Sequence, residues 1–147
     1  MKRLITFLLV FVICGTLCAC NSQNLSETET IVYENCLTLK SMLKDPDSLK
    51  LYNKMFILER PSYADPDEIY TFTIFEYGAS NSFGGIIKST AVFVGDRYLC
   101  DYSELSNGDS PLYRRAKLAL EEFENGDEHT KVIEINIDKI KHKLDID

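Results

Sequence analysis

IYTFTIFEY, residues 69–77, is the stretch of sequence that decides the expected fold. Its side chains alternate between two sides, Tyr70, Phe72 and Ile74 on one and Thr71, Thr73 and Phe75 on the other. This is the two-residue period of a β-strand, in which successive side chains point to opposite faces of the sheet. The segment therefore predicts a strand with a large apolar face that another layer must cover.

Three further segments on either side of this strand also have strand character: residues 49–59, 86–94 and 97–102. The connections between them are short and contain turn-forming residues, such as the prolines and aspartates of residues 61–67 and the pair Gly95-Asp96. Short links between successive strands favour an antiparallel meander.

Two segments, residues 30–44 and 111–125, have the spacing of amphipathic helices. Their apolar stripes are Val32, Cys36, Leu39 and Leu43 in the first, and Leu112, Ala116, Leu120 and Phe123 in the second. Pro46 stops the first helix. Ser110 is a suitable N-cap for the second, and Gly126 is a suitable stop.

The tail, residues 131–144, fits both a strand and a helix, and we favour a strand to about Asn136 followed by a short helix. The expected fold class is α+β: an antiparallel meander sheet of four to five strands, with an N-terminal and a C-terminal helix packed on one face. Both helical stripes are expected to cover the face of Tyr70, Phe72 and Ile74.

The composition is that of one globular domain, with 147 residues, 45% of them hydrophobic and 27% charged. The formal net charge is −7. Nucleic-acid binding needs clustered Lys and Arg to neutralise phosphates, so the charge argues against a nucleic-acid partner.

The N-terminus has the form of an export signal. A short basic start, Lys2-Arg3, precedes LITFLLVFVI at residues 4–13, and this ten-residue run fits an apolar region of about 7–15 residues. It is short for a membrane span, which needs about 20 apolar residues.

The four residues Leu17-Cys18-Ala19-Cys20 resemble the lipobox of bacterial lipoproteins, although Cys18 is an unusual occupant of its position. The resemblance implies cleavage before Cys20, a diacylglyceryl group on its sulfur, and attachment to the extracytoplasmic face of the cell membrane. The expected organisation is a signal peptide over residues 1–19, a polar tether over residues 20–29 and a single domain over residues 30–147.

The other candidate sites are weaker. Cys36 and Cys100 are either joined by a disulfide, which export permits, or are two buried thiols. The two Asp-Pro-Asp sequences, at residues 45–47 and 65–67, are interpreted as turns, and no metal site is expected.

A glycine-rich loop consists of Asn81, Ser82, Phe83, Gly84 and Gly85. It is interpreted as a long hairpin turn. Alternatively, the loop is a contact point at which an exposed Phe83 binds a ligand or a protein.

Leu43-Lys44-Asp45-Pro46-Asp47-Ser48, together with Asn81-Ser82-Phe83-Gly84-Gly85, resembles a group of small uncharacterised exported proteins of Gram-positive gut bacteria. That resemblance brings no known activity. Motifs of the GxSxG, HExxH and P-loop kinds are missing, so neither an enzyme nor a cofactor is expected.

The leading hypothesis is a non-catalytic envelope module that binds a protein or a small ligand. The alternative is a small inhibitor or an envelope-assembly lipoprotein, and the third hypothesis is an enzyme with dispersed catalytic residues.

Overall fold

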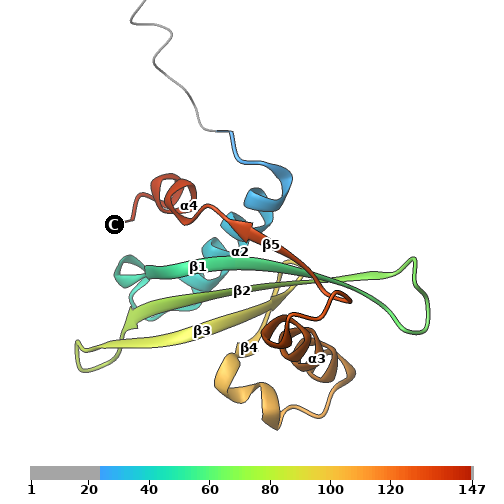
Figure 1. Cartoon of the computed structure of the whole chain (residues 1–147). Helices are drawn as coiled ribbons and strands as arrows, with labels where there is room; N and C mark the ends of the chain where they lie inside the picture. The colour runs from blue at the N-terminus through green and yellow to red at the C-terminus, as the bar shows by residue number, and fades with distance from the viewer. Residues whose placement is uncertain (1–23, 147) are drawn as a thin grey trace, which may run out of the picture.

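The computed structural model describes residues 24–146, so the expected signal peptide and Cys20 lie outside the described residues. The elements in chain order are α2 (Glu27–Met42), the 3-10 helix η1 (Pro46–Ser48), β1 (Lys50–Pro61), β2 (Ile69–Ser80), β3 (Ile86–Val94), β4 (Arg97–Asp101), the 3-10 helix η2 (Tyr102–Asn107), α3 (Pro111–Asn125), β5 (Lys131–Ile135) and α4 (Ile137–Leu144). The five strands form one sheet in the order β4-β3-β2-β1-β5, and all neighbours are antiparallel (Figure 1). The predicted α+β class and antiparallel meander are confirmed.

Helices lie on both faces of the sheet (Figure 1). On one face, α2 and α4 pack against alternate residues of β1 and β2, such as Met55 and Phe75. On the opposite face, α3 and η2 pack against the residues in between, such as Leu58 and Phe72. The prediction that both helical stripes cover the face of Tyr70, Phe72 and Ile74 is therefore wrong for the first helix. The reason is that β2 carries large apolar side chains on both of its faces, and each face needs its own cover.

The first helix begins at Glu27, earlier than predicted, and occupies the end of the expected tether. Its start is a capping box: the Ser26 hydroxyl accepts from the Glu29 amide, and the Glu29 carboxylate accepts from the Ser26 amide. Lys139 of α4 also pairs with Glu29 at 2.9 Å. The polar composition of this segment therefore reflects helix capping.

The other helix ends follow the predicted signals. Ser110 caps α3, and Gly126 ends it in the left-handed region, with φ of +69°. In the tail, the predicted change from strand to helix is confirmed, because β5 ends at Ile135 and the Asn136 side chain caps α4.

The Asp-Pro-Asp sequence at residues 65–67 lies in a turn, as predicted, whereas Pro46 and Asp47 of the first sequence belong to the 3-10 helix η1. Asp65 is in the connection between β1 and β2, where its side chain accepts from the amide of Asp67 at 3.1 Å. Pro46 opens η1 after Asp45. Within residues 24–146, no group of three or more His, Cys, Asp or Glu side chains is arranged to hold a metal ion. No helix in the same residues combines the length and the apolarity that a membrane crossing requires.

Helix α3 covers only part of its face of the sheet. The buried cluster beneath α3 reaches the neighbouring residues Ile74 and Val92 of β2 and β3. The next residues with the same orientation, Glu76 and Thr90, are not part of that cluster. The α3 face therefore has an open end beside the C-terminus of the helix.

Candidate functional site

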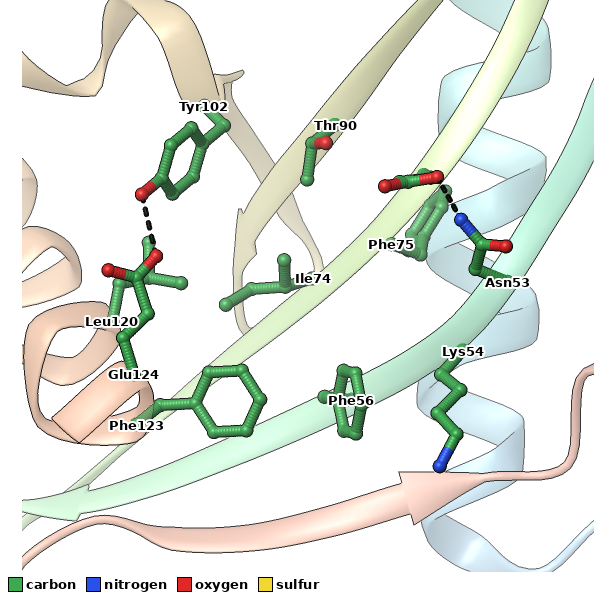
Figure 2. Close-up of a pocket in the computed structure, with 11 residues that line it drawn as sticks. Asn53, Lys54, Phe56, Ile74, Phe75, Thr90, Tyr102, Leu120, Phe123 and Glu124 are labelled. Atoms are coloured by element: carbon green, nitrogen blue, oxygen red, sulfur yellow. Dashed lines mark hydrogen bonds between the residues drawn. The ribbon is translucent and has the colours of Figure 1, made fainter. Parts of the chain in front are cut away.

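A groove of about 390 Å³ lies at this open end, between the sheet and the last turns of α3. Figure 2 shows side chains from β1, β2, β3, η2 and α3 converging on it. Volumes of about 300–1,000 Å³ are typical of small-molecule sites. We take this groove as the candidate functional site and call it the α3 groove.

The floor of the α3 groove is apolar. Its side chains are Phe56 of β1, Ile74 of β2, and Leu120 and Phe123 of α3. The rings of Phe56 and Phe123 meet with centroids 5.0 Å apart and planes tilted by 49°, which is an ordinary aromatic packing geometry. Ile74 and Leu120 are 8% and 5% exposed, so the floor is part of the folded core and is largely preformed.

An irregularity in β1 shapes one end of the groove. The register between β1 and β2 shifts between Tyr52 and Met55, and Asn53 has φ of +52°. Such a bulge turns side chains away from the regular alternation. It brings the Asn53 amide to the carboxylate of Glu76, which accepts a hydrogen bond from it.

The opposite end of the groove carries a second carboxylate. The hydroxyl of Tyr102, at the start of η2, donates to Glu124 of α3 at 2.8 Å. This hydrogen bond, followed by burial, raises the pKa of Tyr102 above its ordinary value of 10.0. Tyr102 therefore remains a protonated donor at neutral pH. In Figure 2 this pair lies across the apolar floor from Asn53.

The cation that lines the groove, Lys54, has an anionic partner outside it. Its ammonium lies 3.0 Å from the carboxylate of Glu134 on β5, and Glu134 is not part of the groove lining. Glu76 and Glu124, by contrast, have hydrogen bonds from neutral donors, the Asn53 amide and the Tyr102 hydroxyl. The groove thus combines an apolar floor with two carboxylates.

The glycine-rich loop is a hairpin turn between β2 and β3, as predicted. The Asn81 side chain accepts from the amides of Phe83 at 2.9 Å and Gly85 at 3.0 Å, and Gly84 has φ of +81°. Ser82 accepts a hydrogen bond from Lys44 at 3.1 Å. Phe83 is 97% exposed, and this loop does not contribute to the α3 groove.

Cys36 and Cys100 lie apart in the structure. Both cysteines are buried and free, and they belong to different clusters on opposite faces of the sheet. The sheet itself separates the two sulfurs, so no small movement would join them. This placement favours the second interpretation, two buried thiols that pack as small apolar side chains.

None of the groove residues was identified as a site residue from the sequence. Asn53-Lys54 is a polar pair inside the otherwise apolar residues 51–58 of β1, but this pair matches no ligand-binding motif. The side chains of Tyr102 and Glu124 carry no motif, and only the fold brings them together.

No family model, no curated protein and no solved structure matches the chain.

Proposed function

We propose that the chain is a non-catalytic binding module, held on the extracytoplasmic face of a membrane by lipid on Cys20, that takes a small ligand in the α3 groove. The observation that carries the binding function is the preformed apolar floor of the groove, bordered by a few polar side chains. This combination is typical of ligand sites, where apolar contacts supply affinity and a small number of polar groups fix orientation.

The proposed attachment to the membrane depends on the lipobox-like residues 17–20. Two or more acyl chains on one residue hold a protein durably, because each buried methylene contributes about 0.8 kcal/mol. Only residues 21–25 separate Cys20 from the N-cap Ser26. Five residues span at most about 20 Å when fully extended, so the folded domain lies close to the bilayer surface.

The groove is tested with a substitution that fills it. Thr90 lines the groove, and Ser89 is its neighbour on β3 with the side chain on the opposite face. We expect small apolar probes to shift the backbone amide resonances of Phe56, Ile74 and Phe123. The variant Thr90→Trp should abolish these shifts, whereas the control Ser89→Trp should keep them. Probes that leave the groove resonances unchanged, or that bind Thr90→Trp as they bind the wild type, would contradict the groove as the ligand site.

Attachment to the membrane is tested separately by fractionation of cells that express the full chain. The wild-type protein should remain with the membranes through an alkaline wash that removes peripheral proteins. Cys20→Ser should be released, because it lacks the acceptor sulfur. Equal retention of both proteins would argue against a lipid anchor on Cys20.

A second candidate function, an inhibitor or an envelope-assembly lipoprotein, acts through a protein partner. The observation that favours it is the exposed tip of the β2–β3 hairpin, where Phe83, Ile86 and Ile87 are 97%, 46% and 57% exposed. Replacement of Phe83 by Ala should then weaken capture of a partner in the envelope without changing the melting temperature. Unchanged capture would remove this candidate.

A further inference from the structure

We propose that the ligand of the α3 groove is an amphipathic organic cation, with an amine or guanidinium group attached to an apolar or aromatic body. This inference rests on the proposed function and adds the chemical class of the ligand. It is drawn from charge complementarity, because the groove brings two carboxylates to the edges of an apolar floor.

The carboxylates of Glu76 and Glu124 can each accept further hydrogen bonds. Glu124 accepts through Oε1 from Tyr102, and Glu76 accepts through Oε2 from Asn53. Each ionised carboxylate has two oxygens with about four acceptor positions in total. Neither makes an ion pair within 4.0 Å with a described Lys, Arg or His side chain. An ammonium or guanidinium group in the groove would supply the missing opposite charge through charge-assisted hydrogen bonds.

The floor of the groove offers apolar contacts to the apolar or aromatic body of such a ligand. Phe56 and Phe123 present aromatic rings, and Ile74 and Leu120 present aliphatic side chains. Aromatic faces attract cations as well as apolar groups. The same sheet face already shows this contact within the chain, because the Lys88 ammonium lies 4.2 Å from the centroid of the Tyr52 ring.

Neither Lys54 nor Lys88 fills this role. Lys54 lines the groove, but its ammonium pairs with Glu134 on β5. Lys88 lies over Tyr52 and does not line the groove. An anionic ligand would instead meet Glu76 and Glu124 and would be repelled by both.

The test compares three probes with one apolar body and different charge: 4-phenylbutylamine, 4-phenylbutan-1-ol and 4-phenylbutyrate. They are titrated by NMR into the chain that starts at Asn21, which retains every residue of both buried clusters. We expect the amine to bind about tenfold more tightly than the alcohol, as one charge-assisted hydrogen bond provides, and the acid to bind most weakly. The preference for the amine should fall as salt is added.

Variants that remove one carboxylate charge test which side chains cause the preference for the amine. Glu124→Gln and Glu76→Gln keep the shape of the side chain, and each should reduce the affinity for the amine while leaving that for the alcohol unchanged. Glu34→Gln, an exposed position on α2 on the other side of the sheet, makes the same change in net charge and should have no effect.

The outcomes separate this inference from the proposed function. If the three probes bind in the groove with equal affinity, or if both groove variants bind the amine as the wild type does, the cation inference is overturned and the binding site remains. If none of the probes binds, the inference and the groove as a binding site fail together.

Discussion

The guanidinium of Arg60 on β1 binds the carboxylate of Glu122 on α3 through two hydrogen bonds, 2.8 Å from Nε and 2.9 Å from Nη2. The side chains are only 4% and 9% exposed. The hydroxyl of Thr130, just before β5, donates to the same carboxylate at 2.6 Å. This network fixes α3 over one end of the sheet, and the α3 groove lies toward the other end of the same face.

Removing one partner of this pair should destabilise the protein strongly. In Glu122→Leu, the Arg60 charge remains buried without its counter-charge, and such a loss typically costs about 3–5 kcal/mol of unfolding free energy. The double variant Arg60→Met/Glu122→Leu should be more stable than Glu122→Leu alone. Urea denaturation measures the unfolding free energy of both variants. The control is Glu121→Ala, which breaks the exposed 3.9 Å pair with Lys117 on the same helix and should change stability by less than about 1 kcal/mol. Equal effects of Glu122→Leu and Glu121→Ala would contradict a stabilising role for the buried pair.

Stability should also fall in acid because of this carboxylate. The hydrogen bonds from Arg60, together with that from Thr130, hold the pKa of Glu122 below its ordinary value of 4.5. A carboxyl whose pKa is lower in the folded state than in the unfolded state stabilises the fold above the unfolded pKa. That contribution is lost as the pH falls through the folded pKa. The unfolding free energy should therefore decrease below about pH 4.5, and this decrease should be shallower in Glu122→Gln. Identical pH profiles for the two proteins would contradict the assignment.

The capping box predicts a defined effect at the start of α2. Ser26→Ala removes the side chain that accepts from the Glu29 amide and should lower stability by about 1 kcal/mol. The control is Ser41→Ala, near the other end of the same helix, where the hydroxyl only donates to the Thr38 carbonyl. If both variants melt at the wild-type temperature, the capping box does not contribute to stability.

The burial of the two thiols predicts that they are unreactive in the folded protein. Burial raises the pKa of Cys100 to about 11, and burial also raises that of Cys36. Since the thiolate is the reactive form, neither should react with a thiol reagent in the folded chain that starts at Asn21. Both should react after denaturation without a reductant. The absence of free thiols in the denatured protein would show a disulfide and contradict the placement of the two residues on opposite faces.

The order and type of the main elements could be predicted because local patterns specify them. The alternation of residues 69–77 and the helical spacing of Leu112, Ala116, Leu120 and Phe123 need no tertiary information. The assignment of helices to faces could not be made in the same way. Phe72 and Phe75 mark both faces of β2 as apolar, and the spacing within a helix does not indicate which face that helix covers.

The groove was beyond prediction for a different reason. It is formed by a bulge at Asn53, the start of η2 at Tyr102 and the last turn of α3 at Glu124, which are far apart in the sequence. Asn53 and Lys54 are polar residues within a largely apolar segment, but nothing in the sequence linked them to Tyr102 or Glu124.

The proposed tethered binding module depends above all on how the N-terminus is processed. The most direct measurement is mass spectrometry of the N-terminal peptide, using protein purified from the membranes of a bacterium that expresses all 147 residues. We predict that the peptide begins at Cys20 and carries the mass of a diacylglyceryl group on its sulfur. An unmodified peptide that begins at any other residue, or one that still begins at Met1, would contradict the tethered binding module.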